Sequence, residues 1–330
     1  MGILSGAGFR AALSKETTAC TLSAGKGHVL PISLQSGFAA WPRQLKGTGG
    51  EVGTGQQPRP TGRGREESGG PFTIPLDHTL VGMLLAAFLT DYTYSAGTPN
   101  THTLKPGTTD PITLSLEAGD STTGALRFTQ STGLVVQSVK FEIADKDLVE
   151  LTFNLVGCGR VMDWDATAAA FTPYSTYLTN ARYLRPDTLI NLNASPVTHI
   201  TRASFEFSRD ITWNWVPNGS RWKSLLALGG WSYLGTVGGF WDSGYEVPNL
   251  GITAGEFTLD FQFNHPSTAG TYCKFSLGAA QGFLERLPEV RDRSFYQVEC
   301  SVEGYATSVV TAPFQVEMKN TATNLLSLWT

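Results

Sequence analysis

The main pattern in this chain is alternation of apolar and polar residues with a period of two. It is clearest in four segments, at residues 135–143, 149–155, 201–208 and 256–263. Successive side chains of a β-strand point to opposite faces of its sheet, so each segment is predicted to be a strand with one buried face. We expect the four strands to share one sheet. The first two should form a hairpin, because residues 144–148 suit a hairpin loop.

The polar positions of these strands form a candidate functional face. They are Ser138, Lys140, Glu142, Glu150, Thr152, Asn154, Arg202, Ser204, Glu206, Glu256, Thr258, Asp260 and Gln262. Five carboxylates against two basic side chains leave this face with three negative charges. A DNA duplex carries about one negative charge per 1.7 Å of its axis, so such a face would repel it. The alternative is an ordinary solvated surface, which also alternates and carries carboxylates.

A helical period occurs once over a long segment. Apolar residues recur at three- and four-residue spacing between Leu80 and Leu89, which predicts a helix near residues 77–90 with Asp77 as its N-cap. A weaker helix candidate covers residues 221–228 and ends at two glycines. The fold class is therefore mainly β, with one flanking helix.

The chain divides into a short arm and one large domain. Residues 1–28 are small and polar, and we expect an extended N-terminal arm there, followed by a β domain over residues 29–330. Within it, residues 43–71 hold too much Gly and Pro to form a core, and they lack a nucleotide-binding glycine motif. We expect this loop to contact an acidic surface of a neighbouring subunit through its basic residues, which are Arg43, Lys46, Arg59, Arg63 and Arg65.

Composition points to association rather than to catalysis. Only 16% of the residues are charged, which is low for a lone soluble subunit, and the net charge of −4 gives no basic field for holding nucleic acid. The four cysteines and five histidines are scattered without a metal-binding spacing, so we expect buried thiols, no metal and no cofactor. We find no signal peptide and no apolar run long enough to span a membrane.

The order of several motifs resembles a known family. A Gly-rich loop precedes G-x-F-T-I-P-L-D-H-x-L-x-G-M-L-L at residues 70–85, and T-P-N-T-H-T-L follows at 98–104. I-T-L-S-L-E-x-G-D lies at 112–120, and a long hairpin ends in L-V-G-C-G at 155–159. Together they resemble the tail tube proteins, or major tail proteins, of long-tailed bacteriophages.

This resemblance implies a fold, partners and a location. The fold would be a β-sandwich or barrel whose strands join those of neighbouring subunits in a closed inner β-barrel. The subunits would form stacked hexameric rings, with further tail proteins at the tube ends and double-stranded DNA passing through without specific binding. The protein would be made in the host cytoplasm and reside in the virion tail, with no membrane partner.

Two other classes of protein are weighed against this one. An enzyme could use Asp163 and Asp165 on either side of Trp164, but the sequence contains no catalytic signature. A carbohydrate-binding or adhesin module could use a group of five tryptophans as an aromatic platform. Filling of subunit interfaces is the preferred account of this group, which comprises Trp213, Trp215, Trp222, Trp231 and Trp241.

Overall fold

The structure is a computed structural model of the chain. It describes residues 9–23, 25–31, 43–46, 63–120, 127–143, 148–166, 171–175, 180–184, 187–198, 200–214, 216, 223–240, 257–284, 289–291, 295–305 and 313–329. The fold is mainly β, as the sequence predicts. Eighteen strands form one hydrogen-bonded network, and β3 (Arg43–Lys46) and β4 (Arg63–Glu67) form a separate ladder.

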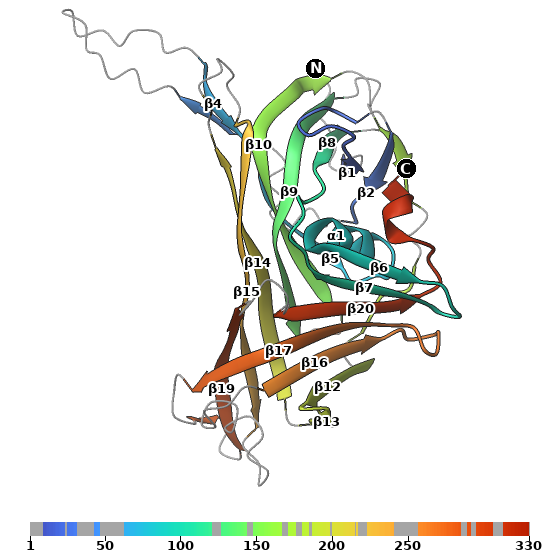
Figure 1. The fold of residues 1–330 in the computed structure, drawn as a ribbon, viewed down its shortest axis with the longest axis vertical. Helices are drawn as coiled ribbons and strands as arrows, with labels where there is room; N and C mark the ends of the chain where they lie inside the picture. Colours follow the sequence, from blue (N-terminus) through green and yellow to red (C-terminus); the bar gives the residue numbers. More distant parts are fainter. Residues whose placement is uncertain are drawn as a thin grey trace, which may run out of the picture.

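The first layer is built on two long antiparallel hairpins. One joins β9 (Arg127–Ile143) to β10 (Glu150–Ala166), and the other joins β14 (Ile200–Asn214) to β15 (Leu225–Phe240). The strands pair in the order β10–β9–β14–β15, and they run along the long axis of the molecule (Figure 1). The hairpin expected around residues 144–148 is therefore confirmed.

Shorter strands extend this layer on both sides. On one side, β5 pairs with the first half of β10. β8 pairs with the first half of β9, on the edge whose second half pairs with β14. On the other side, β19 pairs with the second half of β15. The bounds are β1 (Phe9–Lys15), β2 (Lys26–Val29), β5 (Gly69–Pro75), β8 (Leu114–Asp120), β11 (Thr172–Tyr174), β18 (Glu289–Arg291) and β19 (Phe295–Tyr305).

The second layer pairs in the order β6–β7–β20–β17–β16–β12–β13. Its strands cross those of the first layer in Figure 1. β17 belongs to both layers, because Tyr272–Leu277 pairs with β20 whereas Gln281–Leu284 pairs with β19. The bounds are β6 (Thr90–Ser95), β7 (Asn100–Pro106), β12 (Thr188–Leu192), β13 (Ser195–Pro196), β16 (Phe257–Asn264), β17 (Tyr272–Leu284) and β20 (Phe314–Asn320).

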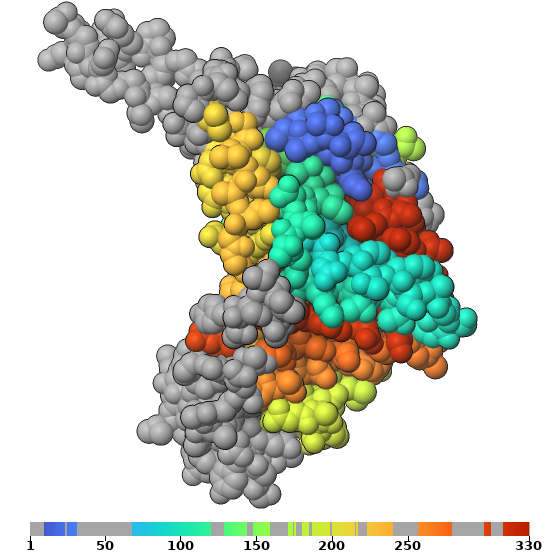
Figure 2. All heavy atoms as spheres, viewed as in Figure 1, coloured from blue at the N-terminus to red at the C-terminus, as the bar shows by residue number. Residues whose placement is uncertain are grey.

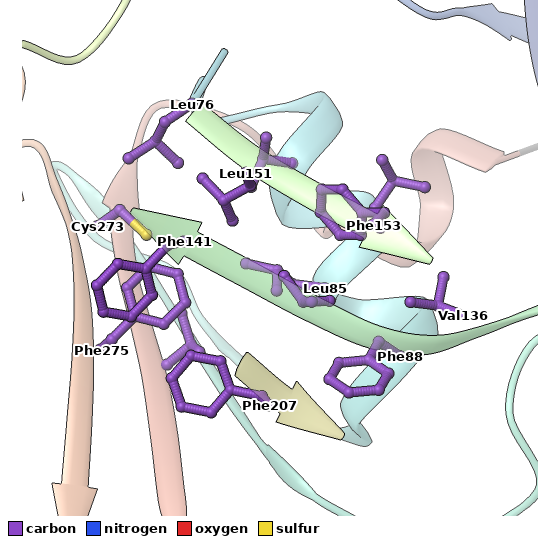
Figure 3. Packing of buried hydrophobic residues seen from close by; sticks show 14 of the residues in the cluster. Leu76, Leu85, Phe88, Val136, Phe141, Leu151, Phe153, Phe207, Cys273 and Phe275 are labelled. Atoms are coloured by element: carbon purple, nitrogen blue, oxygen red, sulfur yellow. The ribbon is translucent and has the colours of Figure 1, made fainter. Parts of the chain in front are cut away.

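Phenylalanine side chains fill the space between the layers. Phe141 on β9 lies 4.9 Å from Phe275 on β17 and 5.2 Å from Phe261 on β16, measured between ring centroids. Phe207 on β14 stacks against Phe275 at 5.7 Å, as Figure 3 shows from close by. The apolar faces predicted from the alternation thus point at one another, and their burial holds the layers together.

The predicted helix is α1 (Leu80–Leu89), and all ten of its residues are buried. It is enclosed by strands and by the C-terminal 3-10 helix η4 (Leu325–Trp329), whose Leu325 packs on Gly82. Asp77 caps the first turn from two residues before Thr79, the structural N-cap: its Oδ1 accepts hydrogen bonds from the backbone N–H groups of Thr79 (2.6 Å) and Leu80 (2.7 Å). The helix is an internal element rather than one that merely flanks the sheets.

One expectation from the sequence differs from the structure, and a second gains a partner for part of its segment. The helix candidate at 221–228 is wrong: its described residues include the start of β15, where Leu225–Leu228 pairs with β14. The described part of the N-terminal arm is not free of the domain, because all seven residues of β1 pair with β8. Residues 225–228 are held by the preceding strand of a hairpin and β1 by a strand distant in sequence, and local composition reveals neither pairing.

Candidate assembly surfaces

The outward face of the first layer carries the polar side chains of the long hairpins. In one row across the sheet, Glu150 lies opposite Glu142, which lies opposite Ser204. In the next row, Lys140 lies opposite Glu206. These five side chains are exposed or half-buried, whereas the residues between them point into the core. The face is therefore hydrated and opposite to the apolar interior.

The charged side chains that the structure describes on this surface define what we call the acidic face, and its charge is counted over these residues. They are Lys140, Glu142, Glu150, Arg202, Glu206, Asp210 and Glu303. Five carboxylates against two cations leave three negative charges. Glu142 and Glu150 are directly opposed across the ladder, an arrangement that costs stability because their charges repel. Asp210 was missed because the strand expected at residues 201–208 ends too early, and Glu303 was missed because its segment was not assigned to this sheet.

The structure brings together nine of the thirteen predicted face residues and separates three. Ser138, Lys140, Glu142, Glu150, Thr152, Asn154, Arg202, Ser204 and Glu206 lie on β9, β10 and β14. Thr258, Asp260 and Gln262 lie on β16 in the second layer, and Glu256 is outside the described residues. Because Phe261 packs against Phe141, the polar faces of β16 and β9 point in opposite directions. The expectation that all four segments share one sheet is therefore wrong, and β15 takes the fourth place.

The outward face of the second layer has a different charge. Its strands carry three lysines and three carboxylates, which cancel: Lys105, Lys274, Lys319, Asp91, Asp260 and Glu317. Lys319 lies 5.4 Å from the centroid of the Tyr272 ring, and the Tyr272 hydroxyl donates to Glu317. The molecule thus presents an acidic surface on one layer and a balanced surface on the other.

One edge of the long hairpins is uncovered in the described part of the chain. Leu225–Trp231 of β15 pairs with β14 on one side, and the β19 ladder on the other side begins only at Ser232. This stretch contains no charged residue, and Leu225 is 55% exposed. Proteins usually protect exposed edges with charges or proline, so this edge is suited to pairing with another chain. In Figure 2, β15 lies on the flank opposite β6 and β7.

A family model decides what kind of protein carries these surfaces. The model described as phage tail tube protein matches residues 6–291, nearly the whole chain. The chain belongs to this family. A search of curated proteins returned no match. The tail tube family consists of structural virion proteins, which agrees with the β-rich fold and with the motif order that the sequence shows.

The loop at residues 43–71, which we call the basic segment, is the predicted contact of this tail tube protein with a neighbouring subunit. Arg43 and Lys46 lie on β3, and Arg63 and Arg65 lie on β4, so the backbone brings four of its five predicted residues into one two-stranded ladder. Arg59 lies outside the described residues. The contact of this segment with a neighbouring tail tube subunit stays a prediction.

The two described tryptophans of the predicted group are internal to the tail tube subunit. Trp231 lies 5.0 Å from Phe88 between ring centroids, beneath the guanidinium of Arg209, and its Nε1–H donates to the Gly107 carbonyl. Trp213 is buried with Val135 and Ile211 in a small second core. Trp231 and Trp213 therefore stabilise the subunit itself and form neither an aromatic platform nor an interface. Trp215, Trp222 and Trp241 lie outside the described residues.

The rival enzyme residues and the buried titratable groups also have places in this subunit. Asp163 and Asp165 lie on β10, and only their backbone is described.

Asp77 is buried, and this burial raises its pKa despite the hydrogen bonds to Thr79 and Leu80 and the Arg182 guanidinium 3.4 Å away. Among the described residues, no group of three or more His, Cys, Asp or Glu is placed to hold a metal ion. In the same residues, no helix has the length and apolarity needed to cross a membrane.

Proposed function

We propose that copies of this tail tube protein join through the edges of their long hairpins into stacked six-membered rings. The uncovered, uncharged edge of β15 carries this proposal, because an open edge gains backbone hydrogen bonds when a strand is added to it. The second half of β10, beyond the β5 ladder that ends at Val156, is the matching edge at the opposite end of the order β10–β9–β14–β15. The number six comes from the family resemblance.

The acidic face would then line the channel, and the balanced face of the second layer would point outward. A barrel of many strands leaves a water-filled interior rather than a packed centre, so hydrated side chains belong there. Six subunits with three net negative charges each would place eighteen on every ring. Double-stranded DNA could pass without adhering, because no excess of basic groups holds its phosphates.

The remaining assignments follow from this role. The protein would be made in the host cytoplasm, act without catalysis or a cofactor, and meet other tail proteins at the tube ends. Electron microscopy of the purified protein tests assembly directly: rings or tubes are expected. A protein that stays monomeric across concentration and salt would contradict the proposal.

The channel assignment is tested by reversing charge at two positions. We expect Glu142→Lys with Glu150→Lys to fold and assemble, because one like-charged pair replaces another at hydrated positions. The acidic face changes from −3 to +1, so the tube should attract phosphates increasingly as salt is lowered. Phage tails built from this variant should eject DNA several-fold more slowly at low ionic strength.

The matched control carries the same charge change on the second layer. Asp91→Lys with Asp260→Lys adds four positive charges to the balanced face, where we expect little effect on ejection. Equal slowing by both variants, or no slowing by the first, would show that the acidic face does not line the channel.

A further inference from the structure

Two cysteines from distant parts of the chain meet beside the second core. Cys20 lies in the connection between β1 and β2, and Cys158 lies on β10, yet their Sγ atoms are 2.9 Å apart. A formed disulfide has an S–S distance of about 2.05 Å, so a small movement would bond the pair. Cys158 is fully buried, whereas Cys20 is half-buried. The Cys20 thiol can therefore be reached from solvent, and the Cys158 thiol lies directly beside it.

The backbone around Cys20 is fixed by a buried carboxylate. Glu16 accepts hydrogen bonds from the Cys20 N–H, the Gly133 N–H and the Ser115 hydroxyl, each at 2.8 Å. These bonds attach the β1–β2 connection to β8 and β9 at the place where the sulfur atoms meet. Because Glu16 itself is 4% exposed, its contacts are shielded from competing water. The approach of Cys20 to Cys158 is thus part of an organised site.

A glycine on β9 leaves space for both sulfur atoms. Gly133 has φ of +68°, a conformation that favours glycine, and a Cβ added there would collide with the Sγ atoms of Cys20 and Cys158. Any other residue at this position would both strain the backbone and push the thiols apart. The Glu16 contacts, one of which is to the Gly133 N–H, and the space left by Gly133 therefore favour the same sulfur–sulfur contact.

We propose that Cys20 and Cys158 form an intrachain disulfide when the protein meets a small disulfide oxidant such as glutathione disulfide. The Cys20 thiolate attacks one sulfur of the oxidant, which forms a mixed disulfide and releases one glutathione. The Cys158 thiolate then attacks the Cys20 sulfur and releases the second glutathione. Two protein thiols and one oxidised glutathione thus become one protein disulfide and two reduced glutathiones.

The bond would tie two distant parts of the subunit together. It links the β1–β2 connection to β10 beside Trp213 of β14, because Cys20 and Cys158 both pack in the second core with this residue. The pair stays reduced in a reducing cytoplasm and oxidises outside it. The timing, after release of the virion from the host, rests on the proposed function, whereas formation of the bond does not.

The purified full-length protein with glutathione disulfide as the probe tests this proposal. The thiol count after denaturation should fall from four to two, and a non-reduced digest should contain the peptide pair linked through Cys20 and Cys158. We expect the melting temperature to rise by roughly 5 °C, because the bond closes a long loop in the unfolded chain, and to return on addition of dithiothreitol.

The remaining cysteines and one variant provide controls. Cys273 and Cys300 are fully buried and should keep their thiols in the folded protein. Cys20→Ser should keep all three of its thiols, because the exposed attacking group is gone. The proposal is overturned if the wild type retains four thiols, if glutathione remains attached to Cys20, or if the link joins two chains. None of these readouts depends on tube assembly, so failure of the disulfide and failure of the tube are distinguishable.

Discussion

At the scale of single residues, His28 shows how burial controls charge in this subunit. It lies on β2 and is fully buried against the C-terminal 3-10 helix, where its Nε2 lies 3.1 Å from the Leu328 carbonyl and its ring contacts Trp329. Removal from water disfavours the charged imidazole and lowers its pKa from 6.5 to about 4, with a smaller contribution from Lys26. The folded protein therefore holds this histidine neutral at pH values where the unfolded chain protonates it.

We expect His28 to make stability depend on acid pH. The pKa of His28 is lower in the folded state than in the unfolded chain. Its contribution to the free energy of unfolding is therefore fully present above pH 6.5 and is lost as the pH falls to about 4. The loss at pH 4.5 should be on the order of 2 kcal/mol. Urea unfolding at pH 7.0 and 4.5 measures it as the difference between wild type and His28→Gln.

The comparison of two proteins is needed because other groups act in the opposite direction. Burial raises the pKa of Glu16 and of Asp77, so lowering the pH relieves the cost of their buried charges. Subtracting the His28→Gln profile cancels these contributions. Identical pH dependence in both proteins would show that His28 is protonated without cost in the fold.

Residue types alone could not decide the role of the five tryptophans. Their composition suited a sugar platform or a subunit interface, yet Trp231 packs on Phe88 of α1, far away in sequence. Conversely, Asp77 was found from sequence because capping depends on the few residues beside it. Local chemistry could be predicted at this scale, and distant packing could not.

At the scale of elements, strands with a clean period were predicted and strands rich in glycine were not. β9, β14 and β16 alternate large apolar and polar residues, which is visible in the sequence. β15 has the sequence LLALGGWSYLGTVGGF, whose glycines interrupt the apolar period and suggested the end of a helix. Its strand conformation instead depends on β14, and part of it on β19. Contacts between strands thus override its weak local preference.

The uncovered stretch of β15 gives a test at this scale. We expect Leu225→Lys to fold normally but to raise the protein concentration needed for assembly by about tenfold, because a neighbouring strand would have to bury the new charge. Sedimentation or light scattering over a concentration series measures this threshold.

Leu189 on β12 supplies the matched control for that substitution. It is 52% exposed, close to the 55% of Leu225, but it lies on the second layer. Leu189→Lys should leave the assembly threshold unchanged. A threshold that shifts equally for both variants would indicate a general effect of charge rather than a contact at β15.

At the scale of the whole molecule, the partner of each strand was the least predictable property. β16 and β14 have the same alternation, and nothing local indicates that one belongs to each layer. Packing determines the layer of each strand, since Phe261 of β16 must face Phe141 of β9 to bury both rings. The β-rich class could be predicted from the alternation and the family from the order of motifs, whereas the acidic face had to be corrected from the assembled sheets.

The basic segment is tested on the assembled molecule. We expect deletion of residues 47–62, with β3 and β4 joined by a short turn, to preserve the subunit and its melting temperature but to block growth of tubes. The deletion keeps four of the five basic residues, so the reason is that the shortened segment would no longer reach the acidic surface of a neighbouring subunit. Electron microscopy of the purified variant measures tube length.

A second variant separates charge from length in that experiment. It keeps the full segment and replaces Arg43, Lys46, Arg59, Arg63 and Arg65 by glutamine. Shortened tubes in this variant would assign the effect to charge. Normal polymerisation of the deletion variant would refute the role of the segment.

The passage of β17 from one layer to the other has a mechanical consequence. One strand carries ladders to β16 and β20 in the second layer and to β19 in the first. The layers therefore cannot shear past one another without breaking these ladders, and a displacement of the first layer must drag the second with it. A strain that starts on the acidic face would be transmitted through the subunit and emerge as movement of the balanced face on its opposite side.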